Sequence, residues 1–74
     1  MKYQRIKDLR EDNDITQKII ADYLMISRSA YQNYESDIRK IPVEILSKIA
    51  DFYGTSVDYL INRTDLQKPY PPVI

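Results

Sequence analysis

The stretch that decides the fold is residues 15–36, ITQKIIADYLMISRSAYQNYES, which predicts two short helices joined by a turn. Thr16 is a good N-cap for the first helix, and Ile15 and Ile20 stand at the two positions of a hydrophobic staple. The same device recurs further along the stretch, where Ser27 is the N-cap of the second helix. The connection between the two helices is therefore only about three residues long.

Such a short connection makes the two helices meet at a steep angle, and the small side chain of Ala21 suits their close crossing. This combination is the signature of a helix-turn-helix. Because any helical hairpin can use Ser or Thr caps, the caps alone leave an ordinary hairpin open as an alternative.

Helical periodicity also fills the sequence on both sides of this pair, whereas alternating strand patterns are scarce. Residues 2–12 predict a first helix, residues 42–53 a fourth that Pro42 opens and Gly54 ends, and Ser56 caps a short fifth helix. We therefore expect an all-α fold, a compact bundle of five short helices. The residues expected to face inward on the fourth helix are Val43, Leu46, Ile49, Ala50 and Tyr53.

The composition fits one small domain without covalent cross-links. The chain has 74 residues, 43% of them apolar, and it contains neither Cys nor His. This excludes disulfides, thiol and imidazole chemistry and the usual zinc sites. The carboxylates that remain, such as Asp8 and Asp12 one helical turn apart, are typical of an ordinary helix surface. We therefore expect no enzyme activity, no metal and no cofactor.

Two further expectations concern location and the C-terminal end. No apolar run is long enough to span a membrane, and the charged start MKYQRIKD lacks the apolar segment of a secretory signal, so a cytoplasmic protein is expected. Residues 1–64 form the helical domain, and residues 65–74, with three of the four prolines, form an extended tail. The tail either takes part in a dimer contact, packs on its own domain or stays disordered. Candidate dimer residues on the fifth helix and the tail are Tyr59, Leu66, Tyr70, Val73 and Ile74.

The third helix carries an outward face of unusual chemistry. At about 100° per residue, Ala30, Tyr31 and Tyr34 cluster on one side, which we expect to face the core. Ordinary solvated faces favour Glu and Lys, because Asn and Ser are weaker helix formers. Here the face holds only residues that can bond to base edges in the DNA major groove or bind a phosphate. A merely polar surface remains the simpler interpretation. These residues are Arg28, Ser29, Gln32, Asn33 and Ser36.

The charge balance limits how such a chain could hold nucleic acid. Eleven Lys and Arg residues oppose eleven Asp and Glu residues, so the formal net charge is zero. DNA-binding domains are typically basic, because phosphate contacts supply most of their non-specific affinity. We therefore expect weak non-specific binding, with affinity coming from a local basic arrangement, from base contacts and from a second copy of the chain.

The stretch at residues 15–36, followed by PVEILSKIADFYGTSVDYLIN at residues 42–62, resembles the phage-repressor and Cro-like (XRE-type) helix-turn-helix family of bacteria and phages. The resemblance covers about residues 3–64 and rests on the joint order and spacing of several short motifs. It implies a lambda-repressor-like DNA-binding domain, in which the third helix, about residues 27–35, lies in the major groove while the second helix crosses the backbone.

The resemblance also implies roles for individual residues. The family's base-facing positions hold Arg28, Ser29, Gln32 and Asn33. The residues implied at DNA phosphates are Gln17, Ser27, Ser36, Arg39 and Lys40. For Gln17, phosphate binding is also physically reasonable because it stands at the positive end of a helix, and a solvated side chain is the alternative. Arg10 and Glu35 match a structural ion pair between the first and third helices.

Two of the positions that depart from the family pattern replace a glycine. Met25 stands where the family usually has Gly, so either it adopts a left-handed conformation at a cost of about 1 kcal/mol or the turn differs. Asp37 likewise replaces a common Gly, and its negative charge would oppose phosphate binding. Neither change removes an implied DNA contact.

Two functions of different classes follow. The first is a sequence-specific regulator of transcription, a repressor that binds a palindromic operator on double-stranded DNA as a homodimer. The second is a protein-interaction module on the same fold, such as an antitoxin or an anti-repressor, which the zero net charge and the aromatic content favour. Binding to a random duplex separates the two, since only the regulator should bind with a clear salt dependence.

Overall fold

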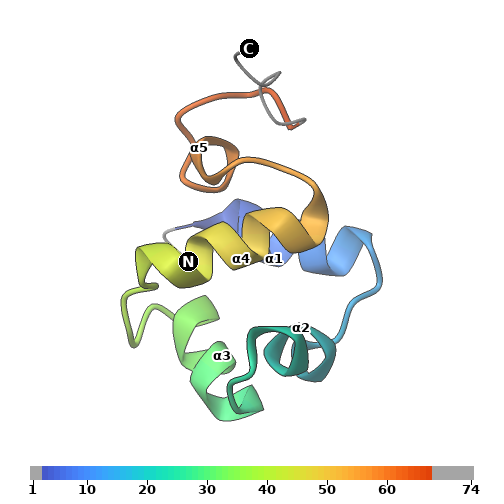
Figure 1. The fold of residues 1–74 in the computed structure, drawn as a ribbon, viewed down its shortest axis with the longest axis vertical. Coiled ribbons are helices and arrows are strands. Elements are labelled where there is room, and N and C mark those ends of the chain that lie inside the picture. Colours follow the sequence, from blue (N-terminus) through green and yellow to red (C-terminus); the bar gives the residue numbers. More distant parts are fainter. Residues whose placement is uncertain (1–2, 68–74) are drawn as a thin grey trace.

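Five helices make up residues 3–67, the part of the chain that the computed structural model describes (Figure 1). They are α1 (Gln4–Asp12), α2 (Gln17–Leu24), α3 (Arg28–Glu35), α4 (Val43–Tyr53) and α5 (Val57–Leu60). The expected all-α fold of five short helices is confirmed, and no strand occurs in the described residues. None of these helices is long and apolar enough to cross a bilayer. The candidate dimer residues Tyr70, Val73 and Ile74 lie outside the described part of the chain.

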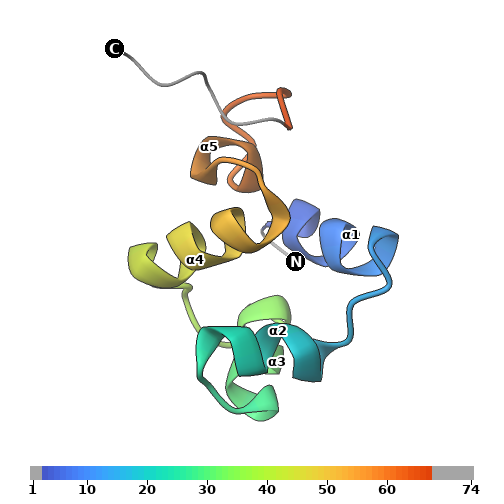
Figure 2. The ribbon, with the colours of Figure 1, turned by 45° about the vertical axis from the view of Figure 1, so that its right-hand side comes forward.

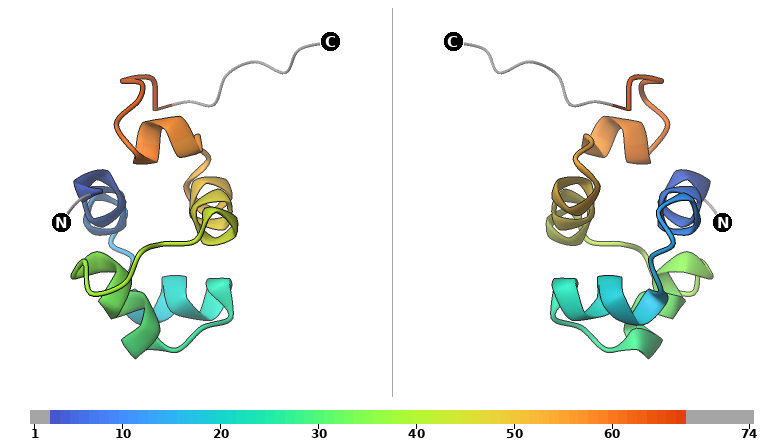
Figure 3. Two further views of the ribbon diagram at one scale, coloured as in Figure 1. Left: turned by 90° about the vertical axis from the view of Figure 1, so that its left-hand side faces the viewer. Right: turned by 90° about the vertical axis from the view of Figure 1, so that its right-hand side faces the viewer.

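Hydroxyl caps fix where three of the helices begin. Thr16 Oγ1 accepts a hydrogen bond from the backbone N–H of Ile19 at 3.1 Å, and Ser27 Oγ accepts one from Ala30 at 3.0 Å. Ser56 caps α5 in the same way. The three predicted caps are therefore confirmed, and they leave only a tight turn between α2 and α3, as Figure 3 shows.

The C-terminal ends of α2 and α4 use one backbone device. Met25 has φ 60° and ψ 38°, and Gly54 has φ 65° and ψ 39°, so both are left-handed. The N–H of the next residue then bonds to a carbonyl five residues earlier, at 3.0 Å after α2 and 2.9 Å after α4. The left-handed alternative for Met25 is thus the one adopted, and Asp37, with φ 62°, is left-handed as well.

Replacing Met25 by glycine is expected to raise the free energy of unfolding by about 0.5–1 kcal/mol, because the relief of backbone strain exceeds the added freedom of the unfolded chain. The side chain is 87% exposed, so its removal costs little packing. The matched variant is Gly54→Ala, which should lower the free energy of unfolding, since no atom lies within 4 Å of the added Cβ and only strain acts. Urea denaturation measures the free energy of unfolding of both variants. A change in the same direction for Met25→Gly and Gly54→Ala would contradict the prediction.

The core draws on all five helices. In Figures 1 and 2, α2 and α3 lie at one end of the molecule, α1 and α4 pass across its middle, and α5 lies at the other end. Tyr31 is the largest side chain that is fully buried, and it fixes which side of α3 faces inward. The buried apolar residues, all at most 6% exposed, are Ile6, Leu9, Ile20, Ala21, Leu24, Tyr31, Leu46, Ile49, Ala50 and Leu60.

Three residues expected to face the core, Ala30, Tyr34 and Val43, do not lie in it, and Tyr53 is only partly buried against it. Val43 is 67% exposed because it is the first residue of α4, after the N-cap Pro42, and projects from the open end of the helix. Tyr34 is only half-buried. Tyr31 and Glu35 set the inward side of α3. Around the helix axis, Tyr34 lies about 60° from Tyr31 and about 100° from Glu35, so it stands at the edge of the buried face.

Arg5 fastens the segment after α5 to α1. Its guanidinium donates to the carbonyl oxygen of Tyr59 at 3.0 Å, pairs with Asp65 at 2.8 Å and lies 4.2 Å from the centre of the Tyr59 ring. The hydroxyl of Thr55 donates a further hydrogen bond to the carbonyl oxygen of Gln67. The described start of the tail therefore lies back on the domain. The contacts of Arg5 could not be predicted from the sequence, because a contact from a side chain to a distant carbonyl leaves no periodic signal.

Candidate nucleic-acid interface

The outward side of α3 presents the polar face expected from the sequence. Arg28, Ser29 and Gln32 are exposed and Asn33 is half-buried, whereas Tyr31 is fully buried. The four predicted base-facing residues therefore share one side of one helix. Within residues 3–67, their side chains make no hydrogen bond or ion pair, so their donors and acceptors are available to a ligand.

A buried ion pair holds α3 against α1. Arg10 Nε lies 2.7 Å from Glu35 Oε2, and Arg10 Nη2 donates to Glu35 Oε1 at 3.1 Å, so the guanidinium binds both carboxylate oxygens. The side chains are only 14% and 6% exposed. The remaining Arg10 Nη1 donates to the carbonyl oxygen of Ile15 at 3.1 Å, so Arg10 also holds the turn before α2. The pair therefore sets the position of α3 and stays away from the exposed face.

Gln17 extends this cluster to α2. Its Nε2 donates to Glu35 Oε1 at 3.3 Å, and its side chain is half-buried. One amide hydrogen is thus used inside the domain, a contact that the sequence did not predict. The other amide hydrogen remains, at the first residue of α2, where free backbone N–H groups favour an anion. Gln17 can therefore connect a phosphate to the ion pair that positions α3.

Lowering the pH is expected to destabilise the domain through Glu35. Burial opposes its charged form, but the polar neighbours Arg10, Tyr31 and Gln17 together outweigh burial and hold the pKa of this carboxyl below its ordinary value of 4.5. The unfolded chain therefore takes up the proton first, so the stability from this group is present above about pH 4.5 and is lost as the pH falls through the folded-state pKa.

Thermal denaturation between about pH 7 and pH 3 measures this effect. Glu35→Gln should be less stable at neutral pH and should lose less stability on acidification than the unmodified protein. Equal losses in the two proteins would exclude Glu35 as a source of the acid sensitivity.

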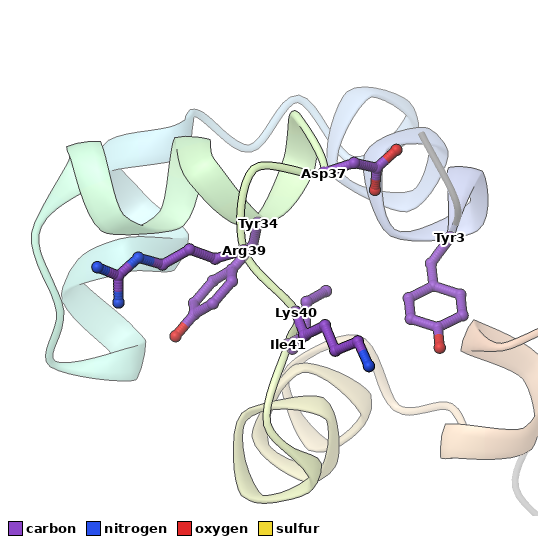
Figure 4. A pocket seen from close by; sticks show the side chains of 6 residues that line it. All are labelled: Tyr3, Tyr34, Asp37, Arg39, Lys40 and Ile41. Carbon is purple, nitrogen blue, oxygen red and sulfur yellow. The ribbon is translucent and has the colours of Figure 1, made fainter.

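The loop after α3 folds back on the end of that helix. The backbone N–H groups of Ile38 and Arg39 both donate to the carbonyl oxygen of Asn33, at 3.0 and 3.2 Å. Arg39 and Lys40 are exposed, and the loop borders a cavity of about 480 Å³ (Figure 4). The residues lining the cavity are Tyr3, Tyr34, Asp37, Arg39, Lys40 and Ile41.

The residues predicted at phosphates lie around the two ends of α3. Ser27 and Ser36 are its N-cap and C-cap, and the Ser27 oxygen accepts the capping bond while its hydroxyl hydrogen remains a donor. Arg39 and Lys40 follow in the loop, and Gln17 contacts the last residue of the helix. The face thus combines unpartnered polar side chains on α3 with hydrogen-bond donors at both ends of the helix.

Residues 6–60 match the model of the family described as helix-turn-helix. The chain belongs to the Cro/C1-type helix-turn-helix family. Membership in the Cro/C1-type family confirms the resemblance drawn from the sequence, and it fits the two capped helices and the polar outer face of α3.

Several curated proteins are similar to this chain over most of its length. The uncharacterized HTH-type transcriptional regulator YobD of Bacillus subtilis (strain 168) is 35% identical over 66 residues, which are 89% of this chain and 59% of YobD. The HTH-type transcriptional regulator AnsR of the same strain is 32% identical over 74 residues, 100% of this chain and 64% of AnsR. The cryptic phage CTXphi transcriptional repressor RstR of Vibrio cholerae is 28% identical over 61 residues, 82% of this chain and 55% of RstR.

The chain therefore spans about three fifths of the length of these relatives. Their names are those of transcriptional regulators, which agrees with the expectation that the chain is not an enzyme. No solved structure matches the chain significantly.

Proposed function

We propose that this protein is a sequence-specific DNA-binding regulator of transcription that acts in the cytoplasm as a repressor. It binds a palindromic operator on double-stranded DNA as a homodimer, with α3 in the major groove and α2 across the backbone. The observation that carries the proposal is the exposed face of α3, whose four polar side chains have no partner within residues 3–67. The repressor named among the relatives supports the mode of action.

The base contacts follow from the chemistry of that face. Arg28 can bind the O6 and N7 atoms of guanine, and Gln32 and Asn33 can each bind the N6 and N7 atoms of adenine. Ser29 can bond to either base. Arg28 and Gln32 are the more exposed of the long side chains, so we assign most of the base discrimination to them.

The phosphate contacts border the same face. We assign them to Gln17, Ser27, Ser36, Arg39 and Lys40. The hydrogen bond from Gln17 to Glu35 leaves one amide hydrogen for the phosphate and holds the amide in place. Fixing a donor before binding reduces the entropy lost in the complex.

A homodimer is proposed because one copy makes too few contacts for useful affinity. The net charge is zero, and one helix reads only a few base pairs. Of the candidate dimer residues that the structure describes, Leu66 is 61% exposed, whereas the ring of Tyr59 is covered by Arg5. Leu66 is therefore the better candidate for a dimer contact.

A protein-interaction module remains the second candidate. The observation that favours it is apolar exposure on α2 and the turn after it, where Ile19 is 47%, Tyr23 46% and Met25 87% exposed. Exposed apolar groups near one another are typical of contacts with proteins.

A titration of a fluorescently labelled random duplex with the protein, at a low and a high salt concentration, separates the candidates. The regulator should bind at low salt and weaken as salt rises, because neutralised phosphates release counterions. Sedimentation of the complex should show two copies per operator duplex. Absence of binding by folded protein at low salt would overturn the proposal and favour the interaction module.

A further inference from the structure

Tyr34 has a phenol that neither the core nor the proposed base-reading face uses. It is half-buried at the edge of α3, and no hydrogen bond engages its hydroxyl within residues 3–67. Tyr31, one turn earlier, is by contrast fully buried. Tyr34 lines the cavity beside the loop after α3. In Figure 4 its hydroxyl points away from that loop.

The loop brings a cation to the same place. The backbone N–H of Arg39 donates to the carbonyl oxygen of Asn33, the residue before Tyr34, at 3.2 Å. The Arg39 side chain is exposed, lines the same cavity and has no partner among the described residues. The Tyr34 and Arg39 side chains therefore extend to the same side of the loop after α3, beside a hollow that both residues line.

The two sides of the loop differ in charge. In Figure 4, Tyr34 and Arg39 extend to one side, whereas Asp37 lies on the other side with Tyr3 and Lys40. The side with Tyr34 and Arg39 therefore offers two donors and, among the residues lining the cavity, no carboxylate. This is the chemistry that binds a phosphate oxygen.

We propose that Tyr34 and Arg39 together bind one backbone phosphate beside the C-terminal end of α3, an assignment that rests on the proposed function. Tyr34 lies about 100° around the helix beyond Asn33, so it points past the base-reading residues toward the edge of the groove, where the backbone runs. Its role is to position the protein on DNA of any sequence, with the phenol as hydrogen donor.

The test compares Tyr34→Phe, Arg39→Gln and the double variant with the unmodified protein. The control is Tyr23→Phe, because the Tyr23 ring packs on Phe52 of α4, 4.8 Å between ring centres, rather than beside the loop. Dissociation constants are measured over a range of potassium chloride concentrations, with a duplex selected by the unmodified protein and with a random duplex. Thermal denaturation verifies that each variant is folded.

Tyr34→Phe should weaken binding to both duplexes by about tenfold for each copy bound, with an unchanged salt dependence, because a lost hydroxyl releases no counterion. Arg39→Gln should weaken binding and lower the salt slope by about one for each copy. The double variant should lose less than the product of the two effects, since both side chains hold one phosphate. Tyr23→Phe should bind like the unmodified protein.

If the unmodified protein binds DNA and Tyr34→Phe binds equally well, the assignment of Tyr34 is wrong and the proposed function stands. If Tyr34→Phe changed only the preference for one base pair, the assignment of Tyr34 would also be wrong, because a phosphate contact carries no sequence information. Fully multiplicative losses would place the two side chains on separate phosphates. If the unmodified protein binds no duplex, the proposed function itself fails, and the assignment with it.

Discussion

Replacing Arg10 by alanine is expected to lower the free energy of unfolding by about 3–5 kcal/mol, a large part of the stability of so small a domain. The change leaves Glu35, whose side chain is 6% exposed, charged and buried without its cation. Gln17 would still donate to Glu35 at 3.3 Å, but a neutral amide cannot replace a guanidinium that binds both carboxylate oxygens. Urea denaturation followed by circular dichroism measures the loss.

The matched control is Lys18→Ala. Lys18 and Asp22 form an ion pair of similar length, 2.9 Å, but their side chains are 74% and 64% exposed. Solvent screens such a pair, so its loss should cost at most about 0.5 kcal/mol. A second variant, with Arg10→Met and Glu35→Leu together, should recover much of the stability, because no charge is then left buried. Equal stability of Arg10→Ala and Lys18→Ala would contradict a structural role for the buried pair.

Replacing Arg28 or Gln32 by alanine is expected to reduce operator binding by about 10- to 100-fold for each half-site, equal to about 1–3 kcal/mol per base contact. Both side chains are exposed and have no partner within the described residues, so the free energy of unfolding should hardly change. Each variant should lose discrimination at one position of the half-site. Titration against operator duplexes that carry single base-pair changes identifies that position.

The matched control is Lys40→Ala, which removes an exposed cation of the loop after α3. It should weaken binding to all duplexes alike and lower the salt slope by about one for each copy, because Lys40 is assigned to a phosphate. A uniform loss in Arg28→Ala or Gln32→Ala, without relaxed discrimination, would remove that residue from the base-reading set.

The positions of the helices could be predicted because the residues that start and end a helix act on backbone groups only a few residues away. Thr16, Ser27 and Ser56 bond to backbone N–H groups three residues further on, so the residue type and the spacing are enough to place the start of each helix. The left-handed Gly54 at the end of α4 was likewise expected, whereas the sequence left open whether Met25 would be left-handed or the turn would differ. The side of α3 that faces outward followed from the positions of its polar residues.

The details that sequence could not supply depend on contacts between distant residues. Arg5 meets Tyr59 and Asp65, which lie more than fifty residues away along the chain. Tyr34 was expected in the core because it clusters with Ala30 and Tyr31 at about 100° per residue, but Tyr31 and Glu35 occupy the inward side of the helix. The bond between Gln17 and Glu35 depends on how α2 meets the end of α3, which no local pattern encodes.

Selection of bound sequences from a random duplex library tests most directly whether α3 reads DNA. The unmodified protein should recover a two-fold symmetric motif whose half-sites have centres about 34–36 Å apart, one turn of DNA. A folded variant with Arg28→Ala, Gln32→Ala and Asn33→Ala together should recover no such motif. Recovery of no motif by the folded, unmodified protein, or of the same motif by the triple variant, would contradict the assignment of α3 as the recognition helix.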